Sequence, residues 1–295
     1  MNLKQLDRMK NGKGFIAALD NSGGSTPKAL EQYGIKSGSF KNDEQMFALM
    51  HEMRSRIITS PSFTKEHIIA AILFQDTLDR TIEGLRPAQY LWEKKGIVPF
   101  LKADKGLAPV EDGVQLMKPF PELKTLLERA TEHEIFGTKM RSVIKEANAK
   151  SIRKVVQQQF DTAQIILGYD LVPIIEPEVD IFSPDKIESE KILKEELLRQ
   201  LSLLDDETKV MFKLSIPTKA GFYTDLINDE HVVRVVALSG GYDQDEANTL
   251  LVKNKGLIAS FSRALAQNLH ITQSDEQFNQ VLASSISRIY EASIS

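Results

Sequence analysis

Charged residues occur inside short apolar segments of this sequence, where burial can change the chemistry of an amine or a carboxylate. Lys213 lies in the segment Val-Met-Phe-Lys-Leu-Ser-Ile, and apolar neighbours that exclude water lower the pKa of a lysine. An amine that has lost its proton can attack a carbonyl carbon and form an imine. Lys213 is therefore a candidate Schiff-base nucleophile. The competing interpretation is a structural lysine that pairs with a buried carboxylate.

Two carboxylates are candidate proton carriers for such a lysine. Glu176 lies in Ile-Ile-Glu-Pro-Glu-Val, where it could move protons during imine formation or serve only as a salt-bridge partner. Asp20 ends another apolar segment, where it could take a hydroxyl proton from a substrate or cap the following turn. Lys139 and Lys102 would lower the pKa of Lys213 further if they lie near it, because like charges repel.

Short apolar runs that carry these residues alternate with longer amphipathic stretches, a pattern typical of repeated βα units and a parallel sheet. We predict eight strands, at residues 14–20, 67–74, 97–104, 136–144, 171–179, 209–216, 232–241 and 256–265. Predicted helices include residues 43–59, 121–133, 147–168, 186–204 and 245–254. The run at 136–144 fits a helix as readily as a strand, so its assignment depends on the rest of the fold.

Eight strand and helix repeats predict an α/β fold of the (β/α)₈ type, a TIM barrel, with residues 1–295 forming a single domain. A doubly wound open sheet is the alternative architecture. The turn after the first predicted strand reads Asp-Asn-Ser-Gly-Gly-Ser from Asp20 to Ser25. It lacks the G-x-G-x-x-G fingerprint of dinucleotide-binding sheets, which favours the barrel.

Residues two apart on a strand face the same side of the sheet. Three predicted strands carry same-face charged pairs, namely Lys102 with Asp104, Lys139 with Arg141, and Glu176 with Glu178. If this face is the barrel interior, five charged residues converge near the mouth: Asp20, Lys102, Lys139, Glu176 and Lys213. Charges there must pair with one another or with a ligand. The C-terminal end of the strands is also where barrel enzymes have their active sites.

The loops after the last two predicted strands are expected to bind phosphate, as loops at this position often do in barrels. In the sequence Ser239-Gly240-Gly241, glycine backbone N–H groups can approach phosphate oxygens, and the serine adds a hydroxyl. Arg263 follows the eighth run and offers a bidentate guanidinium. We therefore predict a phosphate site formed by these four residues.

Composition excludes several other classes of function. The net charge of -4 and pI near 5.8 argue against nucleic acid as a partner, which would require an organised excess of Lys and Arg. The sequence has no cysteine, which excludes disulfides and thiolate nucleophiles and suits a cytoplasmic location. A charged N-terminal segment and the lack of any continuous apolar stretch of about 18 residues predict a soluble chain with no membrane partner.

Metal and cofactor chemistry is not expected from the sequence. The five histidines show no H-x-H or H-x-x-x-H spacing, and only His67 and His231 fall near predicted strands, at the ends away from the mouth. There is no G-x-S-x-G nucleophile elbow and no phosphate-binding P-loop motif. We predict a metal-independent enzyme without a cofactor.

Taken in order, these segments resemble the class I fructose-bisphosphate aldolases, and the matches cover most of the barrel. The resembling motifs are Ala-Ala-Leu-Asp-Asn-Ser around Asp20, Leu-Lys-Ala-Asp-Lys-Gly around Lys102, Lys-Met-Arg from Lys139, Glu-Pro-Glu from Glu176, the apolar strand of Lys213, Leu-Ser-Gly-Gly around Ser239, and Phe-Ser-Arg-Ala-Leu around Arg263. The resemblance implies reversible cleavage of fructose 1,6-bisphosphate in glycolysis and gluconeogenesis, with sugar phosphates as the small-molecule partners.

The resemblance also implies roles for single residues. Lys213 would form the imine, Glu176 would be the acid and base of carbinolamine dehydration, and Asp20 would contact the hydroxyl at the breaking bond, with Lys139 supporting both steps. Ser239, Gly240, Gly241 and Arg263 would hold the phosphate of the ketone half. Further substrate contacts are expected from Lys102, Arg141, Glu178 and Ser25.

Three departures from the animal enzymes of this family indicate a bacterial branch. Met140 stands where they have tryptophan, Ala29 stands beside Lys28 where they have an arginine for the far phosphate, and the chain lacks their C-terminal tyrosine. Another Schiff-base barrel, similar to transaldolase or deoxyribose-phosphate aldolase, is an alternative, as is a non-catalytic barrel that binds phosphorylated metabolites. A homo-oligomer is possible, since apolar helix faces can pack on the barrel or on a second subunit.

Overall fold

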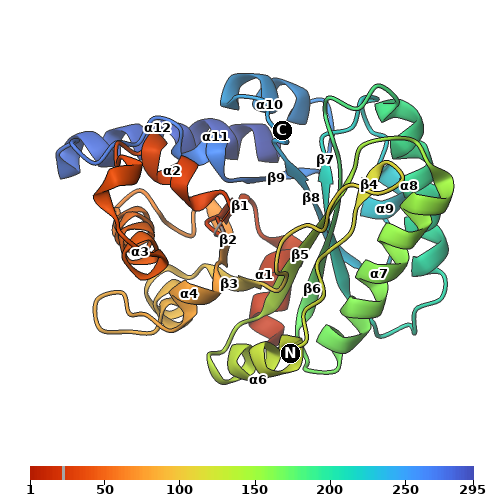
Figure 1. The fold of residues 1–295 in the computed structure, drawn as a ribbon, viewed down its shortest axis with the longest axis horizontal. Coiled ribbons are helices and arrows are strands. Elements are labelled where there is room, and N and C mark those ends of the chain that lie inside the picture. Colours follow the sequence, from red (N-terminus) through yellow and green to blue (C-terminus); the bar gives the residue numbers. More distant parts are fainter. Residues whose placement is uncertain (22–23) are drawn as a thin grey trace.

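The computed structural model describes residues 1–21 and 24–295. Eight parallel strands form a closed barrel, in which each strand pairs with its neighbours in chain order and β3 pairs with β5 to complete the ring. The predicted TIM barrel is therefore confirmed (Figure 1). The barrel strands are β1 (Phe15–Ala18), β2 (Ile68–Leu73), β3 (Val98–Lys102), β5 (Gly137–Ile144), β6 (Val172–Val179), β7 (Val210–Ser215), β8 (Val232–Leu238) and β9 (Ile258–Phe261).

β5 and β6 end where they were predicted to end, whereas the loops after the other barrel strands begin earlier than expected. β1 ends at Ala18, so Asp20 lies just beyond it, and β9 ends at Phe261, so Arg263 begins the short helix α11 (Arg263–Ala266). Residues 136–144, which fitted a helix as readily as a strand in the sequence, contain the strand β5. It is a strand because both of its edges pair with parallel neighbours. A short antiparallel strand that the sequence did not predict, β4 (Val114–Gln115), lies against the end of β5.

Helices cover the outside of the barrel, with α2, α3 and α12 beside β1 and β2 and with α7 and α8 beside β5 and β6 (Figure 1). The five predicted helices are present as α3 (Asp43–Thr59), α6 (Leu123–Glu132), α7 (Ala149–Leu167), α8 (Lys186–Leu201) and α10 (Gln244–Leu251). The remaining helical segments are α1 (Leu3–Asn11), α2 (Thr26–Gln32), η1 (Ser37–Ser39), α4 (Gln75–Leu78), α5 (Pro87–Gln89), the π-helical turn η2 (Tyr90–Lys95), α9 (Thr224–Ile227) and α12 (Asp275–Ile294). In the described part of the chain, no helix combines the length and apolarity needed to cross a bilayer.

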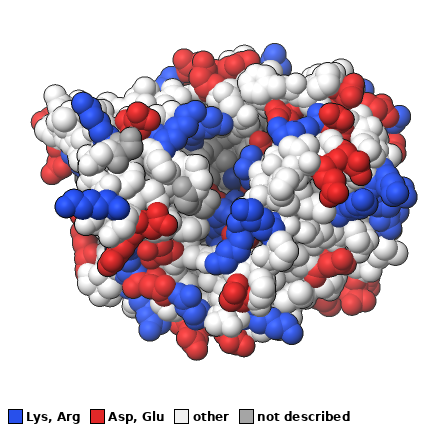
Figure 2. Space-filling model, viewed as in Figure 1, with Lys and Arg blue, Asp and Glu red and all other residues white. Residues whose placement is uncertain are grey.

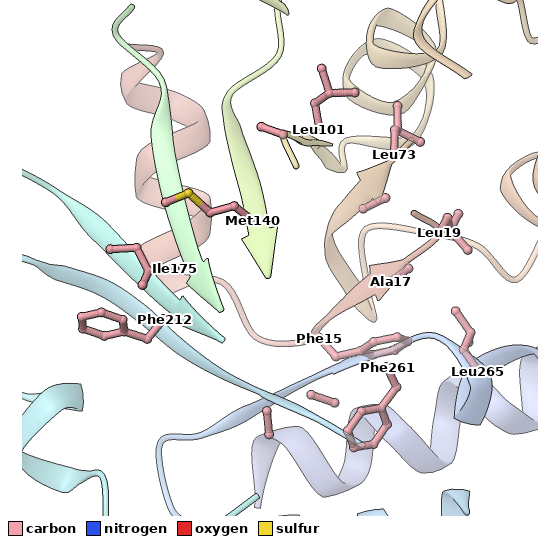
Figure 3. Packing of buried hydrophobic residues seen from close by; sticks show 14 of the residues in the cluster. Phe15, Ala17, Leu19, Leu73, Leu101, Met140, Ile175, Phe212, Phe261 and Leu265 are labelled. Atoms are coloured by element: carbon pink, nitrogen blue, oxygen red, sulfur yellow. The ribbon is translucent and has the colours of Figure 1, made fainter. Parts of the chain in front are cut away.

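Alternation along the strands separates two apolar clusters. The outer face packs against the helices, and Figure 3 shows part of this cluster, including Phe15, Met140, Ile175, Phe212 and Phe261 on the strands and Leu265 on α11. The inner cluster fills the barrel with the residues of opposite parity, among them Ile16, Ala18, Val98, Phe100, Val172, Ile174, Met211, Val236 and Ile258. The inner face continues toward the C-terminal ends as Lys102, Lys139, Glu176 and Lys213, which confirms the inference from strand alternation.

The N-terminal end of the barrel is closed by α1, which packs against β2, β3 and β8. Met9 of α1 is fully buried and belongs to the inner cluster. Arg234 of β8 fastens the helix end by donating to the carbonyls of Met9 at 3.0 Å and Lys10 at 2.7 Å. Because α1 covers the N-terminal end of the barrel with apolar contacts, a substrate enters from the C-terminal ends of the strands.

Candidate active site

A cavity of about 290 Å³ opens at the C-terminal ends of the strands. Figure 2 shows a hollow on the viewed face with Lys and Arg side chains around its rim. Every predicted site residue except Gly241 lines this cavity: Asp20, Ser25, Lys102, Lys139, Arg141, Glu176, Glu178, Lys213, Ser239, Gly240 and Arg263. The residues that sequence alternation grouped together are therefore brought to one place.

Four charged side chains form a continuous chain of ion pairs at the bottom of the cavity. Lys213 Nζ lies 3.0 Å from Glu176 Oε1, and Glu176 Oε2 lies 3.0 Å from Lys139 Nζ. Lys139 Nζ also lies 2.6 Å from Asp20 Oδ2. All four residues are at most 9% exposed. Each carboxylate thus sits within proton-transfer distance of a lysine, in a region from which the protein excludes most water.

The lysines keep both carboxylates ionised. Burial alone would raise the pKa of Glu176, but the charges of Lys139 and Lys213 outweigh it and hold this pKa below its usual value. Burial also opposes ionisation of Asp20, yet Lys139 and Lys213 together place its pKa well below the usual range. For Lys139 burial lowers the pKa, while Asp20 and Glu176 more than reverse this effect, so its pKa is raised. Lys139 is therefore a cation held between two carboxylates that are ionised in the resting site.

The backbone of Glu176 is held by a residue that the sequence did not single out. Its N–H donates to Gln159 Oε1 at 2.8 Å, and Gln159 is completely buried in α7. Gln159 stands on the apolar stripe of this helix, at helical spacing from Val155, Val156 and Ala163. A polar residue on a buried stripe is a signal that sequence reading can use, because such a group needs a specific partner.

Lys102 and Arg141 line the side of the cavity and have their own carboxylate partners. Lys102 contacts Asp104, whose other oxygen accepts from the backbone N–H of Arg141 at 3.2 Å. Burial and the nearby charge of Lys139 lower the pKa of Lys102 to about 7. The guanidinium of Arg141 pairs with Glu178.

The predicted phosphate residues surround the opposite side of the mouth. Gly240 and Gly241 have φ values of +61° and +130°, and a Cβ added to Gly240 would lie 2.8 Å from Ile181 Cγ2. A side chain is therefore excluded for reasons of both conformation and space. A Cβ built on Gly241 would lie 3.9 Å from Arg263 Nη2, which places the exposed guanidinium of Arg263 over this turn. Ser239 is buried beside it.

The loop after β1 and the helix α2 form the third side of the mouth. Ser25 precedes α2, and Lys28, Ala29 and Gln32 of this helix also line the cavity. Lys28 and Gln32 were not predicted as site residues. Ser22 and Gly23 of the Asp20–Ser25 turn lie outside the described residues. Lys28 supplies a cation one position before Ala29, the residue that departs from the animal enzymes.

The histidines lie where the sequence placed them. His67 and His231 directly precede β2 and β8, at the N-terminal end of the barrel. Within residues 1–21 and 24–295, no group of three or more His, Cys, Asp or Glu side chains has a geometry that could hold a metal ion. The charged groups of the mouth are instead arranged as alternating lysines and carboxylates.

The comparisons with known proteins agree with this arrangement. A family model described as "Fructose-bisphosphate aldolase class-I" matches residues 4–216. The chain is 63% identical, over all of both chains, to a Clostridium acetobutylicum protein named fructose-bisphosphate aldolase class 1.

Two solved structures share the fold. One is the Plasmodium falciparum fructose-bisphosphate aldolase, solved with TRAP and an inhibitor, with a TM-score of 0.79 at 20% identity over 98% of this chain and 93% of that one. The other is a Corynebacterium glutamicum protein, with a TM-score of 0.52 at 10% identity over 99% of this chain and 92% of that one. At these identities the structures show the barrel alone. From the family model and the full-length relative together, the chain belongs to the class I fructose-bisphosphate aldolases.

Proposed function

We propose that this chain cleaves fructose 1,6-bisphosphate to dihydroxyacetone phosphate and glyceraldehyde 3-phosphate, reversibly, through an imine on Lys213. The observation that carries the proposal is the chain of ion pairs that joins Lys213 to Glu176, Lys139 and Asp20 at the bottom of the cavity. It provides a nucleophile and two carboxylates in one water-poor site. Given the family's substrates and the lack of a spanning helix in the described chain, we assign the activity to the cytoplasm.

Imine formation begins when Lys213 gives up its proton and attacks the C2 carbonyl of the open-chain ketose. Glu176, 3.0 Å away, is the acceptor. Transfer removes one of the two lysine cations that lower the pKa of Glu176, so this pKa rises and Glu176 can hold the transferred proton. It can then protonate the leaving hydroxyl of the carbinolamine, and water departs to give the protonated imine.

Cleavage follows from the imine. The C3–C4 bond breaks, its electron pair moves to the protonated imine nitrogen to form an enamine, and the proton of the C4 hydroxyl passes to Asp20. Glyceraldehyde 3-phosphate is released by this step. Protonation of the enamine at C3 and hydrolysis of the imine then release dihydroxyacetone phosphate and restore Lys213. Lys139 remains a cation throughout and keeps Asp20 ionised as a base.

The two phosphates are assigned to opposite sides of the mouth. The C1 phosphate lies on the Ser239–Gly240–Gly241 turn beneath Arg263, where backbone N–H groups and a guanidinium meet. For the C6 phosphate a second cavity of about 550 Å³ shares Ser25, Lys102 and Arg141 with the first. Lys105 and Lys118 also line this second cavity. These cations supply the positive charge that an arginine at the position of Ala29 supplies in the animal enzymes.

The function is tested by adding fructose 1,6-bisphosphate to the purified chain after prolonged treatment with EDTA and measuring both triose phosphates. We expect full activity, because imine chemistry uses the lysine as its electron sink and needs no metal. Activity that is lost with EDTA and restored by zinc would contradict the proposal. Cleavage of deoxyribose 5-phosphate, or transfer of a three-carbon unit without release of dihydroxyacetone phosphate, would favour one of the other Schiff-base barrels.

Replacing Arg263 with alanine tests the C1 phosphate site. A hydrogen bond to an ionised group contributes about 1.5–3 kcal/mol, so kcat/KM for fructose 1,6-bisphosphate should fall roughly 10- to 200-fold. The penalty should nearly vanish for fructose 6-phosphate, which lacks the C1 phosphate. A matched control is Lys118→Met, which should weaken use of the bisphosphate but not of fructose 1-phosphate. Equal losses of Arg263→Ala on all substrates would mean that Arg263 stabilises the barrel and does not bind phosphate.

A further inference from the structure

Arg54 is a buried cation that the proposed mechanism does not use. It lies on α3 and is only 1% exposed, and among the described residues it forms no ion pair with a carboxylate. Its stripe on α3 is otherwise apolar, with Met46, Met50, Ile57 and Ile58. Burying an unpaired guanidinium costs free energy, so its presence requires a reason that packing does not supply.

The guanidinium of Arg54 connects two loops of the active-site mouth. Nη2 donates to the backbone carbonyl of Asn21 at 2.6 Å, and Nη1 donates to Thr77 Oγ1 at 2.9 Å. Asn21 directly follows Asp20, while Thr77 is buried in the segment after β2. The Arg54 side chain packs near the ring of Phe74, with Cζ 5.7 Å from the ring centroid. From the outer helix α3, Arg54 thus connects the loop after β1 to the segment after β2.

Asp20 needs such a support because it lies outside the strand ladder. The N–H of Leu19 still donates to Ile72 at 2.9 Å, but β1 itself ends at Ala18. The Asn21 side chain accepts from Ser262 Oγ at 3.2 Å, next to Arg263. The same residue therefore links the backbone held by Arg54 to the phosphate side of the mouth.

Arg54 stays charged in this environment. Burial lowers its pKa to about 10, although the carboxylates of Asp20 and Asp76 oppose this shift. At neutral pH the guanidinium is still a cation, which makes its hydrogen bond to the Asn21 carbonyl a charge-assisted one and hence stronger than a neutral pair.

We propose that Arg54 is a positioning residue for carbon–carbon bond cleavage, which holds the backbone of Asp20 and Asn21 so that the Asp20 carboxylate meets the C4 hydroxyl of the substrate. This inference rests on the role proposed above for Asp20. It separates two steps of the reaction. Imine formation depends on Lys213 and Glu176, which other elements hold, whereas cleavage depends on Asp20, whose backbone Arg54 fixes.

The test compares two measurements on the full chain. Borohydride trapping with dihydroxyacetone phosphate counts the sites able to form an imine, and kcat for fructose 1,6-bisphosphate is then expressed per trapped site. For Arg54→Met we expect trapping to persist and kcat per site to fall about 10- to 100-fold, the scale of a misplaced catalytic group. Arg54→Lys keeps the charge but cannot donate to both acceptors in the same geometry, so it should lose activity to a smaller extent.

The double variant Asp20→Asn, Arg54→Met gives the sharpest result. If Arg54 acts through Asp20, the double variant should match Asp20→Asn alone to within about twofold, because independent effects would multiply instead. The control is Arg56→Met. Arg56 lies on the same helix and makes comparable tertiary contacts, with Gln273 and Asp275, away from the mouth. It should lower the melting temperature without changing kcat per trapped site.

Two results would overturn the inference: an unchanged kcat per trapped site in Arg54→Lys and Arg54→Met, or losses that multiply in the double variant. If Arg54→Met does not fold, the same comparison is made with Arg54→Lys and the corresponding double variant. Failure of the proposed function would look different, since the unmodified chain would then form no trapped adduct. A chain that traps and cleaves normally with Arg54 replaced would refute only the positioning role.

Discussion

Lys213→Met is expected to abolish cleavage of fructose 1,6-bisphosphate while the barrel remains folded. In the proposed mechanism the imine on Lys213 is the electron sink, so kcat should fall by more than about 10⁴-fold, toward the roughly 10⁶-fold loss seen when a covalent nucleophile is removed from a hydrolase. Folding should survive for a structural reason. Methionine has a similar apolar volume, and Glu176 keeps Lys139 as a partner at 3.0 Å.

The matched control is Lys102→Met, which replaces another buried lysine of the same inner face. Lys102 contacts Asp104 and not Glu176, so this variant should bind the bisphosphate more weakly and still form an imine. Thermal unfolding checks that both variants are folded. Residual cleavage in folded Lys213→Met comparable with that of Lys102→Met would show that Lys213 is only a structural partner of Glu176, the alternative that the sequence left open.

Glu176→Gln is expected to lower kcat by about 100-fold or more, the usual scale for loss of a general acid or base. The amide has nearly the same shape, its one oxygen can still accept from either Lys139 or Lys213, and the backbone bond to Gln159 is unaffected. What it cannot do is take a proton from Lys213 and return it to the leaving hydroxyl. The rate at which dihydroxyacetone phosphate forms a trappable imine should fall in parallel with kcat.

Glu178→Gln provides the comparison for Glu176→Gln. Glu178 lies two residues along the same face of β6 but pairs with Arg141, so its change should act mainly on KM. Steady-state kinetics of the two variants side by side separates proton transfer from charge pairing. If Glu176→Gln retained the kcat of the unmodified chain, the carboxylate would be a salt-bridge partner without a chemical role.

Alternation and charge made the barrel interior predictable from the sequence. Counting in twos groups Lys139 with Arg141 and Glu176 with Glu178 on one face of their strands, and all four line one cavity. This works because a buried strand allows only two orientations, and a charge on the apolar inner face is tolerated only near partners.

Other features could not be predicted because tertiary contacts decide them. The two-residue strand β4 exists only through its pairing with Ile144 and Val143 of β5. The helix α1 closes the barrel through contacts with strands far along the chain. Arg54 and Gln159 act on the site from outer helices, and only their polarity on buried stripes marks them in the sequence. That signal indicates a specific partner but does not name it.

The most direct test of the imine mechanism is reduction with borohydride in the presence of dihydroxyacetone phosphate, followed by peptide mapping of the labelled chain. Only an imine is reduced to a stable amine under these conditions, so the adduct reports the nucleophile itself. We predict complete inactivation and one adduct on the peptide that contains Lys213. An adduct on Lys139 or Lys102, or inactivation without any adduct, would contradict the mechanism.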